Sequence, residues 1–223
     1  MPNGGEPPIR TRFGSRKRAA VPGCRYRRGV ELVVLVDDDG NHVGTADKSA
    51  VHGARTPRHL AFSCYGFGAD GRLLVTRRAR HKVTFPGVRT NTCCGHPAPG
   101  EPMEDAVRRR LRHELDVEVT DLRLLLPHFT YRASAHGIEE HELCPVFAGT
   151  LVGTPRPRPD EVDSCEWWPW GRFLAAAADP ASDVSPWARL QAPLLDRLRD
   201  GSSPGAPPPP HATGSPPTGP PRT

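Results

Sequence analysis

Short segments that are apolar, or that alternate between apolar and polar residues, recur along the chain and predict β-strands. Asp38-Asp39-Gly40 and Asp70-Gly71 have the composition of tight turns, so each predicts a hairpin between the strands that flank it. The predicted strands are 30–36, 42–45, 60–67, 72–78, 129–133, 142–151 and 166–170, with two further apolar segments at 117–119 and 122–126.

A helical period replaces this pattern in three places. The clearest is 101–115, where an apolar residue recurs at every fourth position. These residues are Met103, Val107, Leu111 and Leu115. Further helices are predicted at 171–178 and at 187–199, the latter kinked or restarted at Pro193. Residues 79–99 have no clear period, and a connection of that length inside a compact domain is usually functional. The mixture of elements predicts an α+β fold.

The 223 residues include 27 Pro and 22 Gly and carry a formal net charge of +5, but these features are unevenly distributed. Residues 1–29 have eight Lys and Arg against one acid and carry +7, whereas 201–223 carry +1 and contain nine prolines. The remainder, 30–200, therefore carries −3. We expect a disordered basic arm, one folded domain at 30–200 and a disordered Pro-rich tail. Because the basicity belongs to the arm, we expect neither nucleic acid nor a membrane as a partner.

The cysteines indicate the compartment. Among the six there is no Cys-x-x-Cys pair, which disfavours a zinc ribbon. No apolar run approaches the ~20 residues that span a bilayer. We therefore expect a cytoplasmic protein whose cysteines are thiols. Cys64, Cys144 and Cys165 lie in apolar, strand-like segments and are expected to be buried and inert.

A string of residues that starts at Gly95 has the spacing of a known motif. Gly95 is followed by Glu101 and then by Arg109-Arg110-Leu111-Arg112-His113-Glu114-Leu115-Asp116-Val117. The string resembles the Nudix box, G-x5-E-x7-R-E-U-x-E-E-x-G-U with U apolar, whose glutamates hold Mg²⁺ on a diphosphate. The resemblance implies a Nudix-type α/β/α sandwich with a mixed β-sheet in a single domain. Arg110 and His113 replace two of the glutamates, which removes much of the expected metal cage and argues against hydrolysis.

The flanking segments narrow the resemblance. They are Asp47-Lys48-x3-His52-x6-His59, Leu74-Val75-Thr76-Arg77-Arg78, Lys82-x3-Pro86-Gly87, Thr90-Asn91-x-Cys93-Cys94-Gly95-His96-Pro97, Tyr131-Arg132-Ala133 and Glu140-His141-Glu142-x-Cys144-Pro145. Together they closely resemble the type 1 isopentenyl-diphosphate Δ-isomerases, from about residue 31 to Trp187. The resemblance implies an isomerase of isoprenoid precursor biosynthesis that interconverts isopentenyl and dimethylallyl diphosphate. It implies divalent metals, no redox cofactor and a small prenyl diphosphate as the partner.

That reaction has definite chemical requirements. Protonating an unactivated alkene gives a carbocation that water would capture, so the site needs a positioned acid, a base on the opposite face and exclusion of water. The carboxyl of Glu142 and the thiol of Cys94 are suitable groups. By resemblance, Glu142, assisted by Tyr131, protonates the terminal alkene carbon and Cys94 takes the proton from C2. The alternative for Cys94 is another buried thiol, and its Gly/Pro-rich loop beside His96 argues against that.

Metal ligands are implied in the same way. Three imidazoles and two carboxylates match the family's pattern, at His52, His59, His96, Glu140 and Glu142. This mixture suits Mn²⁺, Zn²⁺ or Mg²⁺. Glu140 and Glu142 are two residues apart and would project from one face of a strand. Glu114 would hold a separate Mg²⁺ that bridges the diphosphate, the alternative being a plain helix ion pair with Arg110.

A diphosphate also needs cations. By resemblance, Lys48, Arg78 and Lys82 contact it. Two of these are lysines in a chain with 27 arginines and three lysines, which indicates that a compact ammonium is required, although solvated surface lysines are the alternative. Arg110 is expected to orient the carboxylate four residues further on, or to touch phosphate. Trp187 would stabilise the carbocation through its ring face, or is a core residue.

Two other functions account for parts of the sequence. A Nudix hydrolase of a small diphosphate substrate would share the fold, but it would not need a cysteine at position 94. A module that binds nucleic acid or an anionic surface would rest on the basic arm alone, since no known RNA- or DNA-binding motif is visible. A monomer or a weak dimer is expected.

Overall fold

The computed structural model describes residues 31–199, so the predicted basic arm, the Pro-rich tail and Cys24 lie outside the described residues. The described range holds two β-sheets and four helices, which form one α+β unit. Among these helices, none is both long enough and apolar enough to cross a membrane.

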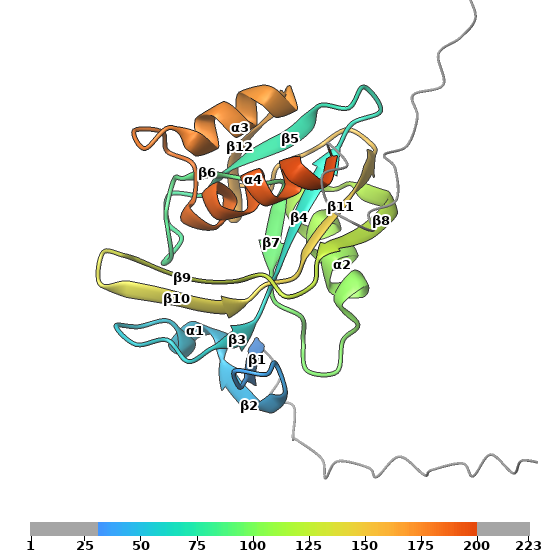
Figure 1. Ribbon diagram of the computed structural model, residues 1–223. Helices are drawn as coiled ribbons and strands as arrows, with labels where there is room; N and C mark the ends of the chain where they lie inside the picture. The colour runs from blue at the N-terminus through green and yellow to red at the C-terminus, as the bar shows by residue number, and fades with distance from the viewer. Residues whose placement is uncertain (1–30, 200–223) are drawn as a thin grey trace, which may run out of the picture. The chain divides into compact units, whose positions relative to one another are not determined.

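The smaller sheet has five strands in the order β2-β1-β3-β10-β9 (Figure 1). They are β1 (Leu32–Val36), β2 (His42–Asp47), β3 (His59–Leu60), β9 (Thr130–Ala135) and β10 (Ile138–Leu143). β1 and β2 form the first predicted hairpin. β3 lies parallel to β10 with His59 opposite Glu142, so this sheet places two predicted metal ligands next to each other.

The larger sheet has seven strands. They are β4 (Phe62–Phe67), β5 (Leu73–Arg78), β6 (Arg89–Thr90), β7 (Cys93–Gly95), β8 (Glu118–Leu126), β11 (Val146–Val152) and β12 (Val162–Trp168). The main path is β12-β5-β4-β11-β8, with β6 beside β5 and β7 beside β4. The sheet is mixed, as predicted, because β11 is parallel to β4 and antiparallel to β8.

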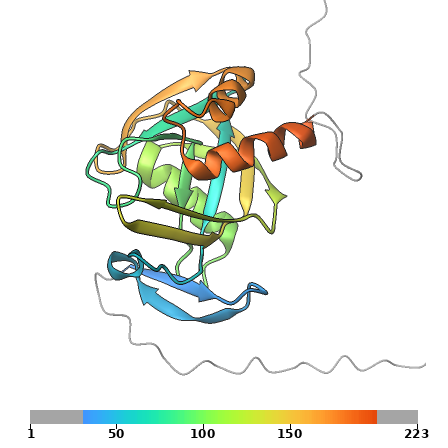
Figure 2. The same ribbon diagram turned by 60° about the vertical axis from the view of Figure 1, so that its left-hand side comes forward.

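Helices pack on both faces of the larger sheet and complete the predicted α/β/α sandwich (Figure 2). They are α2 (Met103–Leu115), α3 (Trp170–Ala178) and α4 (Pro186–Arg199), whereas α1 (Lys48–Val51) lies against β1 and β2 of the smaller sheet. Along β4, Phe62 and Cys64 enter the core beneath α2, whereas Tyr65 enters the core beneath α3 and α4. α4 continues through Pro193 as one helix.

Two predicted strands are divided between the sheets, so the prediction of one continuous strand was wrong for each. The segment 60–67 breaks at Ala61 into β3 and β4, and 142–151 breaks at Pro145 into β10 and β11. Pro145 has no N–H with which to continue a strand ladder. The two breaks lie beside each other, since the Ala61 N–H donates to the Leu143 carbonyl at 2.9 Å.

The second predicted hairpin opens just beyond its turn, where β4 and β5 pair at a single position. Residues 89–95, the β6–β7 wedge, lie between the two strands from there on. The Thr92 hydroxyl in this wedge donates to the Leu74 carbonyl and accepts from the Gly66 N–H, both at 2.7 Å. The predicted loop at 79–99 is therefore partly strand, and its side chains replace the missing ladder between β4 and β5.

Helix α2 confirms the amphipathic pattern read from the sequence. Val107, Leu111 and Leu115 are fully buried, although the helix begins at Met103 rather than at 101. Its C-cap is Asp116, which occupies the glycine position of the box and has φ 55° and ψ 39°. Asp is among the few residues with a Cβ that adopt this left-handed conformation at low cost, so the departure from glycine is accommodated.

Candidate active site

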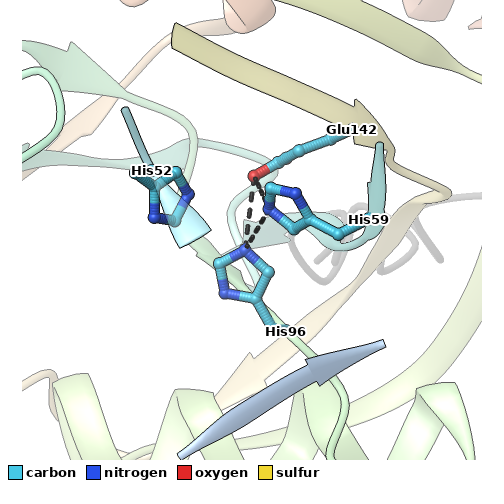
Figure 3. A group of neighbouring side chains, drawn as sticks. All are labelled: His52, His59, His96 and Glu142. Carbon is cyan, nitrogen blue, oxygen red and sulfur yellow. Dashed lines mark hydrogen bonds and ion pairs between the residues drawn. The ribbon is translucent and has the colours of Figure 1, made fainter. Parts of the chain in front are cut away.

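Three histidines and a glutamate converge where the two sheets adjoin (Figure 3). His52 follows α1, His59 begins β3, His96 follows β7 and Glu142 lies on β10. Their candidate ligand atoms all lie within 4.8 Å of one another. Glu142 Oε1 is 3.3 Å from His96 Nε2 and 3.5 Å from His59 Nε2, and these two nitrogens are 3.2 Å apart.

The hydrogen bonds around this cluster show which ring nitrogens face it. His59 Nδ1 lies 3.0 Å from the Pro57 carbonyl, and since a carbonyl only accepts, Nδ1 carries a proton and Nε2 is the nitrogen that faces Glu142 and His96. His96 faces the cluster with Nε2, and His52 Nε2 is buried without a hydrogen-bond partner among residues 31–199. Three imidazoles and a carboxylate are a donor set for a divalent cation. The residues present therefore fit a metal ion.

Burial and mutual proximity set the charge states of the cluster. Burial, with His59 and His96 adding to it, lowers the pKa of His52 to about 4. Burial likewise lowers the pKa of His96, whereas the pKa of His59 is raised because Glu142 outweighs burial. Burial would raise the pKa of Glu142, but the hydrogen bonds from His59 and His96 hold it far below its ordinary value. Neutral His52 and ionised Glu142 are the states that bind a metal.

Glu140 projects from the same face of β10 as Glu142, and both side chains are buried, as their spacing predicts. Glu140 is nevertheless not one of the four converging residues. Its Oε2 accepts a hydrogen bond of 2.8 Å from the Tyr131 hydroxyl. Burial and the charge of Glu142 raise the pKa of Glu140. Tyr131 is the β9 residue opposite Glu142 in the β9–β10 ladder. Its hydroxyl is nevertheless hydrogen-bonded to Glu140 rather than to Glu142.

Cys94 is half-buried on β7. Its Sγ lies 3.3 Å from Asn91 Oδ1 and 3.5 Å from Ser63 Oγ. Burial raises the pKa of the Cys94 thiol to about 11, with the charge of Glu142 acting in the same direction and Arg78 opposing it. The thiol is therefore protonated at neutral pH, and it lies close enough to Glu142, the predicted acid, for that charge to affect its pKa.

The remaining described cysteines are free thiols, as predicted. Cys64 and Cys144 are buried, and burial raises the pKa of both thiols well above the ordinary value. Cys165 is only half-buried, so the prediction of a buried thiol was wrong there. Its side chain packs against the edge of the core beneath α2.

Aromatic rings surround Trp187, which is 2% exposed at the start of α4. Its ring centroid is 5.4 Å from that of Phe85, edge to face, and 5.8 Å from that of Tyr131. The guanidinium carbon of Arg78 lies 5.7 Å from the Trp187 centroid. The charge of Arg78 also opposes the rise in the pKa values of Glu140 and Cys94. This cation therefore lies between those two groups and the rings of Phe85, Tyr131 and Trp187, which we call the aromatic wall.

Arg110 is buried on α2 between two carboxylates. Its Nε and Nη2 donate to Glu114 Oε1 at 2.8 and 2.5 Å, and Nη2 is 3.2 Å from Glu161 Oε2. Glu161 Oε2 also accepts a hydrogen bond from Lys82 Nζ. Gly95 allows this packing, because a Cβ there would lie 3.0 Å from Arg110 Cγ. Predicted substrate cations from α2 and from the loop after β5 therefore meet at one carboxylate.

Lys48 begins α1 and donates to Glu31 Oε2 at 2.6 Å. That hydrogen bond is the main cause of the lowered pKa of Glu31, to which Arg110 also contributes. The ion pair is solvent-exposed on the Glu31 side, where the side chain is 65% accessible. Lys48 can therefore exchange this partner for another anion at little cost.

Glu161, which contacts two predicted substrate cations, is a candidate site residue that the sequence did not indicate. It lies between a Pro-rich connector and β12, where an acidic residue gives no local signal of function. Tertiary contacts fix its place: the Arg158 N–H donates to the Glu114 carbonyl at 2.8 Å, and the Ala79 N–H donates to the Glu161 carbonyl at 3.0 Å. The backbone thus joins the connector to α2 and to the loop after β5, which carry the cations that Glu161 contacts.

The chain matches a known domain family and is similar in sequence to known proteins. Residues 57–188 match the family model of the NUDIX domain. The isopentenyl-diphosphate Delta-isomerase of Mycolicibacterium vanbaalenii is 59% identical over 167 residues, which cover 74% of this chain and 92% of that protein. That of Agromyces mediolanus is 55% identical over 169 residues, covering 75% and 82%.

Solved structures support the fold. The crystal structure of DR0079 from Deinococcus radiodurans aligns with a TM-score of 0.56 over 72% of this chain and 96% of that one, at 24% sequence identity. The MutT protein of Methanosarcina mazei aligns with a TM-score of 0.51 over 63% and 94%, at 17% identity. At these identities the likeness concerns the fold alone.

Proposed function

Because the chain belongs to the isopentenyl-diphosphate Δ-isomerase family, within the Nudix superfamily, we propose that it interconverts isopentenyl diphosphate and dimethylallyl diphosphate. The observation that carries the proposal is the placing of a thiol, Cys94, and a buried carboxylate, Glu142, beside a wall of aromatic rings. Moving a double bond by one carbon requires one proton to be added and another removed at a site closed to water.

In the proposed mechanism Glu142, in its acid form, protonates the terminal alkene carbon, and Cys94, as thiolate, removes a proton from C2. The product has gained one proton and lost another, so after turnover Glu142 is ionised and Cys94 carries a proton on its sulfur. Protonated Cys94 and ionised Glu142, the states favoured by the surroundings of the two groups, are the reactive pair for the reverse conversion. Tyr131 takes part through Glu140, to which its hydroxyl is bonded.

The aromatic wall suits the cationic intermediate. The faces of Trp187 and Tyr131 offer negative quadrupole density, and a cation over such a face is stabilised by about 2 kcal/mol when desolvated. Apolar rings also exclude the water that would capture the carbocation. This supports a direct role for Trp187 in addition to its place in the core.

The proposed diphosphate contacts are Lys48, Arg78, Lys82 and Arg110. Lys82 and Arg110 share Glu161, and each retains N–H donors that this carboxylate does not use. Arg78 extends the cationic groups toward the aromatic wall. A diphosphate bound to these cations would direct its short hydrocarbon end toward Cys94 and Trp187.

The His/Glu group can hold a divalent cation, and we propose Mn²⁺, Zn²⁺ or Mg²⁺ there, held by His52, His59, His96 and Glu142, with Glu140 as a further ligand. We propose a separate Mg²⁺ at Glu114, where Arg110 bonds only to Oε1 and leaves Oε2 to face a cation. When bound, such ions supply positive charge that offsets the charge of a diphosphate. No redox cofactor enters the proposal, and a cytoplasmic location and a monomer or weak dimer stay predictions.

The deciding experiment is incubation with isopentenyl diphosphate and Mg²⁺ or Mn²⁺, analysing products and released phosphate together. We expect the dimethylallyl isomer without phosphate release. Liberated phosphate or monophosphate would instead support the Nudix hydrolase. Cys94→Ala should abolish turnover while the circular dichroism spectrum stays unchanged, and full activity in that variant would contradict the role of the thiol.

A further inference from the structure

Asn91 lies between the two short strands of the β6–β7 wedge, and it is fully buried. It belongs to the motif around Cys94 but has no part in the function proposed above. Its side-chain amide makes five hydrogen bonds, an unusually complete set for one residue. Nδ2 donates to the carbonyls of Cys64 and Cys93 at 3.0 and 2.9 Å.

The oxygen of the same amide accepts from three donors. Trp187 Nε1 donates to Asn91 Oδ1 at 3.1 Å, Cys94 Sγ at 3.3 Å and Thr90 Oγ1 at 2.8 Å. One buried atom is thereby bonded to both the proposed proton carrier and the proposed aromatic stabiliser. These two residues come from β7 and α4, which are far apart in the sequence.

Chemistry fixes the orientation of the amide. The indole N–H of Trp187 can only donate, and the two backbone carbonyls can only accept, so the oxygen must face Trp187 and the nitrogen must face the carbonyls. Exchanging the two ends would create three unfavourable contacts in a buried site. Because the oxygen can only accept, Cys94 meets it with its S–H proton.

We propose that Asn91 is a positioning residue, which directs the S–H of Cys94 and holds the indole plane of Trp187 at a fixed place relative to that sulfur. The inference rests on the proposed isomerase function, since it concerns the two groups that handle the proton and the cation. Ser63 supports the arrangement from the other side of the sulfur, with its Oγ 3.5 Å away and itself bonded to Gln191 at 3.0 Å. Without Asn91, the thiol and the indole would keep their other neighbours but lose the hydrogen-bond acceptor that they share.

The test compares Asn91→Ser with Thr92→Val as a matched control. Thr92 is the adjacent buried residue and also bridges β4 and β5, but its side-chain hydrogen bonds within residues 31–199 reach neither Cys94 nor Trp187. We expect Asn91→Ser to lower kcat by about 10- to 100-fold with KM within about threefold, because misplacing a reacting group costs rate rather than binding. Thr92→Val should lower Tm while kcat stays within about threefold.

A spectroscopic measurement keeps the test independent of how well Asn91→Ser folds. The infrared S–H band of Cys94, isolated as the difference between wild type and Cys94→Ala, should lie at the lower frequency of a hydrogen-bonded thiol. It should move to higher frequency in Asn91→Ser. A band at the free-thiol position in the wild type would overturn the inference, as would a kcat loss in Asn91→Ser no larger than in Thr92→Val. A wild type without isomerase activity would overturn the proposed function instead.

Discussion

Replacing Glu161 by Gln removes one charge from the place where two proposed substrate cations meet. The carboxylate accepts from Lys82 and lies 3.2 Å from Arg110 Nη2. Burial opposes its ionisation, but the charges of Arg110 and Lys82 prevail and lower the pKa of Glu161 from 4.5 to about 2. Gln keeps the size and one acceptor, so the substitution isolates the charge.

The size of the stabilisation by Glu161 follows from this lowering of its pKa. A change from 4.5 to about 2 corresponds to about 3 kcal/mol of favourable interaction at most. The Glu161 side chain is 15% exposed and that of Lys82 25%, so solvent screens part of it and about 1–2 kcal/mol should remain. Arg110 keeps its bonds to Glu114 in the variant and is not left as an unpaired buried charge.

The direction of the Glu161 pKa shift determines how its contribution to stability depends on pH. The pKa of Glu161 is lower in the folded than in the unfolded chain, so the stabilisation is complete above about pH 4.5 and is lost as the pH falls toward 2. Urea unfolding followed by circular dichroism should therefore show Glu161→Gln less stable by about 1–2 kcal/mol at pH 7, with a gap that narrows from pH 4.5 to 3.

Glu118→Gln is the matched control, because Glu118 pairs with Arg112 in an ion pair whose side chains are both more than half exposed. We expect little change in the free energy of unfolding for that variant. The reasoning would be refuted by a Glu161→Gln variant as stable as the wild type at pH 7. A loss of equal size at pH 7 and pH 3 would refute it too, since that would indicate packing rather than charge.

Three further outcomes are expected. Dialysis against EDTA should lower Tm and added Mn²⁺ or Zn²⁺ should restore it, since an ion at 100 times its Kd stabilises the folded protein by about 2.7 kcal/mol. His59→Asn should bind less metal by elemental analysis and show no such response. Trp187→Leu should lower kcat by about 30-fold, corresponding to about 2 kcal/mol of cation–π stabilisation, and Trp187→Phe by less; equal losses in the two variants would argue for a purely structural tryptophan. Deleting residues 1–29 should leave kcat and KM unchanged, and a large loss would show that the arm takes part in the reaction.

The sequence by itself determined what depends on neighbours along the chain. The apolar stripe of α2 follows from helical spacing, and the same-face burial of Glu140 and Glu142 follows from the period of a strand. The resemblance of short sequence strings to the isomerase family also pointed to His52, His59 and His96 as metal ligands. The stripe and the strand face are set by backbone geometry over a few residues.

Only the tertiary structure decided which segments meet. The breaks at Ala61 and Pro145 place β3 beside β10, and that pairing brings His59 to Glu142. Glu161 joins Lys82 to Arg110, and Asn91 joins Cys94 to Trp187, through contacts that no local pattern encodes. The physical reason is that a buried polar group must find its partner in space, and the packing of two sheets and their helices, rather than the spacing of residues, determines which partner lies within reach.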